Sequence, residues 1–329
     1  MTALPPLSLL DRALARAGEG EGAALQAVIA RAGAADTQGF LRFWVAEHHG
    51  VPGITGAAPA VLMAAIAAAT TDLRVGSGGI MLPNHQPLVV AEQASTLDQL
   101  HPGRIDLGVG RSLGFTPAVR SALRTPTSTD AGFVEDLVEL LSYLDGTAPV
   151  TSRPRPASRI PVFVLATRRG VALAAQAGLG VVLGGPVVAD PERARTLVEG
   201  YRSSFRPSGH GDRPHVVVAV NALAADTGSA ARDLVLPEAW AMAQSRTVGE
   251  FRPLEPVQAV QQAAMTARQR RLVQDHVDAA VHGTPQEVGR ELEDLVAATG
   301  ADELLLTGAT HDLRAQARSD ELLAELVRD

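Results

Sequence analysis

Short apolar runs rich in β-branched residues recur along the chain, and longer stretches with apolar positions at helical spacing separate them. The short runs end in Gly, Pro or polar residues, as buried strands do. They predict eight strands, at residues 6–10, 42–46, 73–82, 105–110, 160–165, 181–183, 215–220 and 303–306. The stretches between them predict helices at 23–35, 59–70, 88–100, 133–144, 171–177, 190–205, 284–299 and 311–327.

Strands that alternate with helices imply a parallel sheet, because each helix returns the chain to the same edge. Eight such units in 329 residues predict an α/β fold, a (β/α)8 TIM barrel in a single domain over residues 1–329. An insertion after strand seven, at 226–281, is mostly helical. Within it, 244–256 mixes Gly, Pro and charged residues, which predicts a mobile lid. A doubly wound sheet is the second interpretation of the same alternation.

The amino-acid composition excludes several kinds of catalytic chemistry and argues against some classes of partner. The chain has no Cys and no Lys, which excludes disulfides, thiolate nucleophiles, Schiff-base lysines and a Walker-type P-loop. A formal net charge of −7 argues against nucleic acid as the main partner. No apolar run reaches the ~18–20 residues of a membrane span, and residues 1–10 lack the features of a signal peptide. We therefore expect a cytoplasmic protein that binds no membrane.

Three titratable residues, Glu47, His48 and His49, follow the apolar strand predicted at 42–46. Polar groups are costly to bury at a strand end unless a cleft opens there, and barrel active sites lie at that end. The other interpretation is that the three residues cap the strand. Side chains of neighbouring strand residues point to opposite faces, so we expect no shared metal ion. One histidine is instead expected to act as a base or hydrogen-bond donor, and the other to face away.

Glycines interrupt the strand predicted at 73–82, at positions 76, 78 and 79. Either the barrel packs tightly there or a flat ligand lies against bare backbone. A second glycine group, Gly108 to Gly114, faintly resembles a dinucleotide fingerprint, but its spacing is one residue too long and we reject that interpretation. Arg111, at the end of its strand, is nevertheless well placed to bind an anion.

A second anion site is predicted where Thr167, Arg168, Arg169 and Gly170 join a strand to the next helix. Backbone N–H groups at a helix start, beside a hydroxyl and arginines, bind phosphate. The alternative is that Thr167 simply caps the helix. A further histidine, His85, follows the glycine-rich strand and is expected to be structural.

These residues belong to stretches that resemble the bacterial luciferase-like flavin monooxygenases. The stretches are Trp44–His49, Arg74–His85, Leu97–Arg111, and Gly283–Val288 with Ala301–Leu304. Their order and spacing span nearly the whole chain. The resemblance implies a (β/α)8 barrel that binds reduced FMN (FMNH2) at the carboxyl ends of the strands. It also implies reaction with O2 to a flavin hydroperoxide, which oxygenates a small organic substrate, within the group associated with natural-product pathways.

The resemblance also assigns residues. It implies that His48 is the catalytic histidine, with Glu47 beside it in the cofactor site. Gly78 and Gly79 would lie against the isoalloxazine ring, where the family often has a non-prolyl cis peptide. The FMN phosphate would be held by Arg111, Thr167, Arg168 and Gly170.

Two departures from the family pattern keep other functions open. Gly170 stands where a second hydroxyl residue is common, and Leu183-Gly184-Gly185-Pro186 replaces an aromatic residue and a histidine. The alternatives are an oxidoreductase that uses the deazaflavin F420, and a non-catalytic flavin-binding or partner subunit. Because no nicotinamide motif is present, a separate flavin reductase is expected to supply FMNH2. The apolar helices at 59–70 and 88–100 predict a homodimer.

Overall fold

Parallel strands close into a barrel in the computed structural model, which describes residues 4–125, 127–166 and 168–327. The third barrel strand is in two pieces, β3 and β4. The strands are β1 (Leu7–Asp11), β2 (Arg42–Val45), β3 (Arg74–Ser77), β4 (Ile80–Met81), β5 (Ile105–Gly110), β6 (Val162–Leu165), β7 (Gly180–Gly184), β8 (Val216–Val220) and β11 (Glu303–Leu306). Because β3 pairs with both β2 and β5, the sheet is closed. The (β/α)8 prediction is therefore confirmed, and the doubly wound alternative is wrong.

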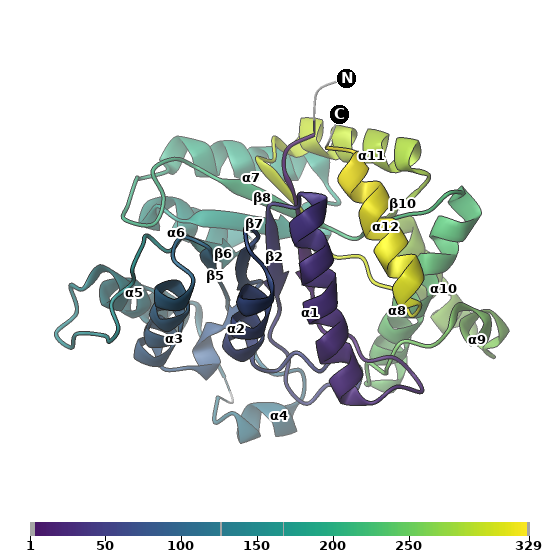
Figure 1. Cartoon of the computed structure of the whole chain (residues 1–329), viewed down its shortest axis with the longest axis horizontal. Helices are drawn as coiled ribbons and strands as arrows, with labels where there is room; N and C mark the ends of the chain where they lie inside the picture. Colours follow the sequence, from purple (N-terminus) through teal and green to yellow (C-terminus); the bar gives the residue numbers. More distant parts are fainter. Residues whose placement is uncertain (1–3, 126, 167, 328–329) are drawn as a thin grey trace.

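Helices cover the outside of this barrel, and α1, α2 and α3 stand side by side along one flank (Figure 1). The barrel helices are α1 (Glu21–Gln38), α2 (Pro59–Ala69), α3 (Pro87–Leu100), α5 (Asp130–Asp145), α6 (Arg168–Ala177), α7 (Pro191–Ser204), α11 (Pro285–Thr299) and α12 (Leu313–Glu325). The short α4 (Pro117–Ala122) was not expected from the sequence pattern. Each barrel helix starts after the carboxyl end of a strand, so the helix starts and the strand ends share one face.

The third barrel strand is split by its glycines. The Gly78–Gly79 peptide bond is cis, as the family resemblance implies, and it separates β3 from β4. A Cβ atom on Gly76 would lie 2.5 Å from Trp44 Nε1, and one on Gly78 would lie 2.6 Å from Leu10 Cδ1. Tight packing inside the barrel therefore explains these glycines without a ligand.

Buried charges fill the amino end of the barrel interior. Arg42, the first residue of β2, donates to Asp106 at 2.6 Å and to Glu303 at 2.9 Å. Burial opposes ionisation of Asp106, but the guanidinium groups of Arg42 and Arg74 hold its pKa below the ordinary value. A buried network of this kind at the amino end of a barrel serves stability rather than catalysis.

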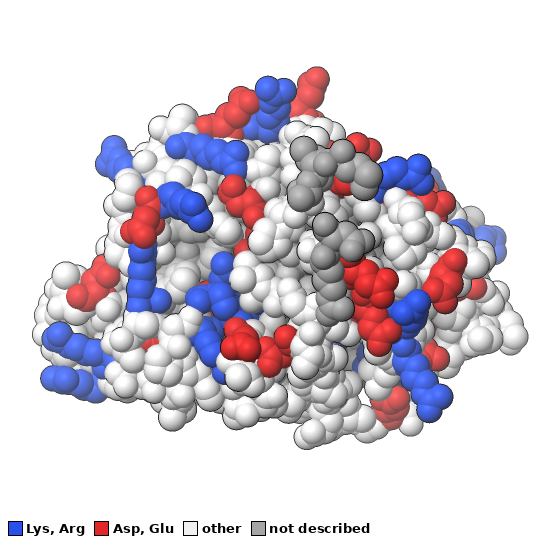
Figure 2. Space-filling model, turned by 45° about the horizontal axis from the view of Figure 1, so that its top comes forward, with Lys and Arg blue, Asp and Glu red and all other residues white. Residues whose placement is uncertain are grey.

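The described part of the chain starts and ends at the amino-terminal end of the barrel (Figure 1). Figure 2 looks onto this end and shows arginines interspersed with acidic residues rather than a patch of one sign. Such mixed charge produces no extended field of one sign.

The insertion after β8 forms a separate group of helices beside α12 (Figure 1). It contains β9 (Ala222–Ala224), α8 (Gly228–Val248), α9 (Val257–Gln262), α10 (Ala267–Ala279) and β10 (Val281–Gly283). The two short strands pair in parallel and return the chain to the barrel. The insertion has its own apolar core, which includes Val235, Trp240 and Val277.

The segment predicted to be a mobile lid is tied to the barrel. Leu254 is fully buried, and its backbone N–H donates to the carbonyl of Ala15 at 2.8 Å. Ala17 donates back to Leu254, and Gly53 donates to Phe251, each at 2.8 Å. Backbone bonds and burial of this kind argue against the expected lid, because a moving segment keeps few of either. The segment forms a fixed wall of the barrel mouth.

Candidate active site

Glu47 is the centre of a hydrogen-bonded group at the carboxyl end of β2. Its Oε1 accepts from His49 Nε2 at 2.6 Å and from His85 Nε2 at 2.8 Å, while Oε2 accepts from the Met81 N–H at 2.8 Å. Burial opposes ionisation of Glu47, yet the bonds from His85 and His49 hold its pKa below the ordinary value. A buried carboxylate with these three donors is ionised near neutral pH.

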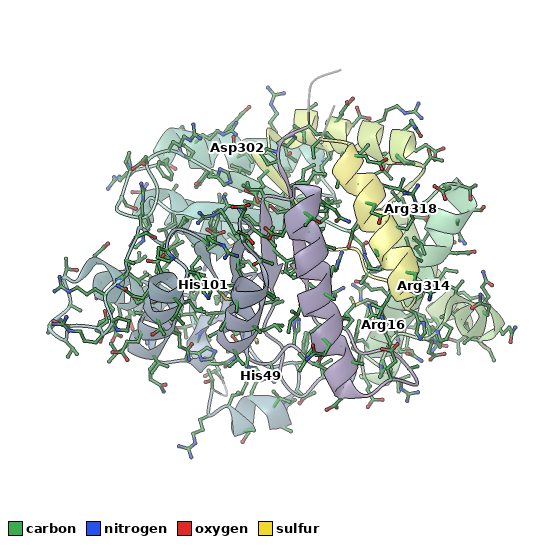
Figure 3. The ribbon with its side chains drawn as sticks, in the orientation of Figure 1. Arg16, His49, His101, Asp302, Arg314 and Arg318 are labelled. Atoms are coloured by element: carbon green, nitrogen blue, oxygen red, sulfur yellow. The ribbon has the colours of Figure 1, made fainter. Side chains whose placement is uncertain are left out.

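Two sequence-based expectations are corrected here. The alternation of a strand predicts that His49 faces away from the site, but β2 ends at Val45, so alternation no longer applies. His49 turns back to Glu47 instead, and Figure 3 shows it at the end of the barrel opposite Asp302. His85 was expected to be merely structural, yet it is a direct partner of Glu47.

His48 has a buried imidazole nitrogen that accepts and donates no hydrogen bond within the described part of the chain. Its backbone N–H donates to the carbonyl of Gly56 at 2.9 Å, which fixes the main chain. Its Nδ1 is buried and has no hydrogen-bond partner among the described residues. Burial, followed by the positive charge of Arg12, lowers the pKa of His48 to about 4. The ring is therefore neutral near pH 7, with one nitrogen available to hold or pass on a proton.

An aromatic side chain covers this imidazole. The ring of Phe115 stacks on His48, with ring centres 5.7 Å apart and planes 9° from parallel. Phe115 itself is 65% exposed, so one face meets His48 and much of the rest meets solvent. A Cβ atom on Gly50 or Gly114 would clash with the side chain of Val119 in α4. The helix α4 therefore packs closely against the loops that contain these two glycines.

A buried ion pair also joins the insertion to the barrel mouth. Arg12 follows β1, and its Nη2 pairs with Oε1 of Glu238 in α8. His276 of α10 lies 4.0 Å from the same oxygen, and burial lowers its pKa. No sequence signal identified Arg12 or Glu238, because 226 positions separate them and only the fold brings them together.

A second polar region surrounds a cavity of about 700 Å³ at the ends of β5 and β6. Arg111, Asp130, Arg169, Gly170 and Arg193 are among its lining residues. Arg111 and Arg169 both pair with the carboxylate of Asp130. The predicted association of Arg111 with the start of α6 is therefore present, whereas Asp130 and Arg193 were missed.

The other residues assigned to the FMN phosphate and the isoalloxazine ring include Thr167, Arg168, Gly170 and Gly79. Thr167 and the side chain of Arg168 lie outside the described part of the chain. A Cβ on Gly170 would lie 2.9 Å from the Ala166 Cβ, so a hydroxyl residue there would require the loop to shift. A Cβ on Gly79 would lie 2.9 Å from Leu165, which lines the cavity.

Two further findings concern the described residues only. Within 4–125, 127–166 and 168–327, no three His, Asp or Glu side chains are arranged to hold a metal ion. In the same ranges, no helix combines the length and the apolar character needed to cross a bilayer.

A parallel barrel with a polar group and a cavity at the carboxyl ends of its strands is the architecture of the TIM-barrel enzymes. The chain's relatives make the assignment specific. A model of the luciferase-like monooxygenase family matches residues 7–303. A luciferase-like monooxygenase of Escherichia coli strain K12 is 36% identical over 329 residues, covering 98% of this chain and 97% of the relative. The chain belongs to the luciferase-like monooxygenase family and is an enzyme of that family.

Solved structures agree with this membership. The crystal structure of apo-MsnO8 matches with a TM-score of 0.85 and 31% identity, covering 98% of both chains. The oxygenating constituent of 3,6-diketocamphane monooxygenase from a Pseudomonas putida plasmid was solved with FMN. It matches with a TM-score of 0.72 over 98% of this chain and 97% of its own. Its identity is 17%, so it shows the shared fold alone.

Proposed function

We propose that this protein is a monooxygenase that uses reduced FMN and O2 to oxidise a small organic substrate. The observation that carries the proposal is the pairing of two features on one face of the barrel. One is the neutral imidazole of His48, whose buried Nδ1 has no partner among the described residues. The other is the cavity of about 700 Å³ with Arg111, Arg169 and Arg193 in its lining.

The residues present fit a phosphorylated flavin. Arginines bind phosphate through charge-assisted hydrogen bonds, and Arg111, Arg169 and Arg193 are the arginines available for it. Thr167 and Arg168 remain assigned to the same phosphate by resemblance. Gly78 and Gly79 remain assigned to the isoalloxazine ring by the family resemblance. When bound, reduced FMN supplies the electrons with which O2 is activated.

We assign separate roles to His48, to Glu47 and to the residues that cover them. His48 holds or moves a proton at Nδ1, because its depressed pKa leaves the ring neutral. Both oxygens of Glu47 are already used by protein donors, so we assign Glu47 to positioning rather than to direct contact with the flavin. Phe115 and the fixed wall at 251–254 limit the access of water to the site.

The cavity has the charge needed to hold the phosphate of FMN, a monoester with a charge near −2. Three arginines and one acid line the cavity, which leaves a surplus positive charge suited to the monoester. F420 stays the alternative because an F420-dependent secondary alcohol dehydrogenase shares the fold, with a TM-score of 0.71 and 16% identity over 99% of this chain.

The test is anaerobic titration of the isolated protein with reduced FMN and, separately, reduced F420, followed by rapid mixing with O2. We expect reduced FMN to bind and its reoxidation rate by O2 to differ from that of the free flavin. Tighter binding of F420 would favour the dehydrogenase alternative. Binding of FMN with an unchanged reoxidation rate would favour the non-catalytic subunit.

A separate flavin reductase is part of the proposal. No nicotinamide-binding motif was identified in the sequence, which favours reduction of the flavin by another enzyme. The protein incubated with NADH and FMN alone should therefore leave NADH unchanged, and addition of a flavin reductase should start O2 consumption.

A further inference from the structure

Asp130 is the acidic residue in the lining of the arginine-lined cavity. Its two carboxylate oxygens are divided between two guanidinium groups. Oδ1 pairs with Arg111, which follows β5, and Oδ2 pairs with Arg169 of α6 at 2.7 Å. Asp130 is also the first residue of α5, so three separate elements meet at this one carboxylate. The two arginines at the cavity are thus occupied by an anion that the chain itself supplies.

A third arginine at the same cavity has no such partner. Arg193, in the first turn of α7, lines the cavity, and its Nε is buried without a hydrogen-bond partner among the described residues. A buried guanidinium nitrogen that lacks an acceptor is unfavourable unless a ligand provides one. Arg193 therefore indicates that the cavity receives an anion in addition to Asp130.

The pairs around Asp130 are easily exchanged. The Asp130 side chain is 41% exposed and that of Arg169 is 89% exposed. Ion pairs this exposed contribute little stability, because water screens them. A phosphate monoester carries about twice the charge of a carboxylate and offers three oxygens instead of two. It can therefore replace the carboxylate on both arginines and still reach a third.

We propose that Asp130 is a resident counter-ion that the phosphate of the flavin displaces from Arg111 and Arg169, with Arg193 completing the phosphate site. The proposal rests on the proposed function for the identity of the ligand. Asp130 makes FMN binding weaker than the three arginines alone would make it. A cofactor that arrives reduced from another enzyme and leaves oxidised must be released readily, and a competing carboxylate favours that release.

The experiment measures binding by calorimetry under anaerobic conditions, with reduced FMN and reduced riboflavin as the two ligands. Asp130→Asn should bind FMN about two- to thirtyfold more tightly than the wild type, since two exposed ion pairs no longer compete. Riboflavin affinity should not change, because riboflavin has no phosphate. Arg193→Gln should weaken FMN and leave riboflavin unchanged.

Glu135→Gln is the matched control. It removes the same charge from an exposed position of α5, and Glu135 does not line the cavity. Its FMN affinity should equal that of the wild type. The proposal is overturned if Asp130→Asn binds FMN no more tightly than the wild type does, or if Glu135→Gln or riboflavin shows the same gain.

Binding of inorganic phosphate tests the role of Asp130 independently of the proposed flavin function. If the wild type binds neither flavin, the flavin assignment is wrong, and phosphate binding followed by 31P NMR still decides the role of Asp130. Tighter phosphate binding by Asp130→Asn than by Glu135→Gln would uphold the counter-ion. Equal binding by the two variants would overturn it.

Discussion

The imidazole of His48 and the ring of Phe115 lie almost parallel, 9° apart, with centres separated by 5.7 Å. The stack joins the segment after β2 to the loop before α4, two segments that no local sequence pattern relates to each other. It leaves the buried Nδ1 of His48 unpartnered among the described residues while it fixes the plane of the ring. A general acid or base needs this combination of a fixed ring and a free nitrogen.

Replacement of His48 should reduce turnover strongly. Proton transfer by a positioned side chain contributes about 10²- to 10⁴-fold, so His48→Ala should lose at least a factor of about 10² in kcat. Affinity for reduced FMN should change far less, because the arginines lie at another part of the mouth. His49→Ala is no control, since His49 binds Glu47. His101→Ala, after α3, is the better one, and a comparable loss there would contradict the assignment.

The depressed pKa of His48 sets the pH dependence of this step. An ordinary histidine with a pKa near 6.5 becomes charged below about pH 6.5, whereas His48, with a pKa of about 4, stays neutral down to about pH 5. Turnover should therefore show no loss from His48 protonation between about pH 5 and 8. A fall in kcat with an apparent pKa near 6.5 that disappears in His48→Gln would show that the ring titrates normally.

Arg111→Ala should discriminate between FMN and riboflavin. A charge-assisted contact to phosphate contributes roughly 1.5–3 kcal/mol, which corresponds to about ten- to a hundredfold in affinity. Only FMN carries the phosphate, so only its affinity should fall in a titration. Equal losses for both flavins would place Arg111 away from the phosphate. Arg120→Ala, in nearby α4, serves as the control for a lost positive charge.

Asp106→Asn should destabilise the barrel. Asp106 is fully buried between Arg42 and Arg74, and removal of its charge leaves Arg42 with Glu303 alone and removes the carboxylate that pairs with Arg74. Breaking a buried pair typically costs about 3–5 kcal/mol, which urea unfolding would measure. The folded pKa of Asp106 is depressed, so its contribution is present above the unfolded pKa of about 3.9 and is lost as pH falls below it. A difference between variant and wild type that persists undiminished at pH 2 would contradict this origin.

The flank formed by α2 and α3 predicts a homodimer. Val61 of α2 is 72% exposed, and Val89 and Leu100 of α3 are also exposed. An apolar face of this extent on neighbouring helices is typical of an interface between protein copies. Light scattering at micromolar concentration should give twice the chain mass for the wild type and the monomer mass for Val61→Asp. Val150→Asp, at an exposed apolar residue outside α2 and α3, should remain dimeric.

The strands and most helices were predictable because each shows a local pattern of apolar residues in the sequence. A run such as 304–306 is apolar on every residue, and the Thr284–Glu287 capping box can be recognised in the sequence and is present in the structure. The strands β9 and β10 have three residues each, too few to show a period. Neither strand was therefore predicted.

The site was only partly predictable, for a different reason. The sequence showed that Glu47 and His48 follow a strand, but not that β2 stops at Val45, which turns His49 toward Glu47. Asp130 and Arg193 come from separate elements and meet at one cavity only when the barrel closes. Contacts between distant positions leave no local pattern in a single sequence.

The two tryptophans lie in different regions of the molecule, so the fluorescence of each reports on its own region. Trp44 is fully buried inside the barrel and donates to Asp106, whereas Trp240 lies in the core of the insertion and donates to Glu255. Trp240→Phe leaves an emission signal from the barrel interior alone, and Trp44→Phe leaves one from the helices at its mouth. The chain thus carries a native pair of optical reporters, and the order in which the two regions melt can be followed without any attached dye.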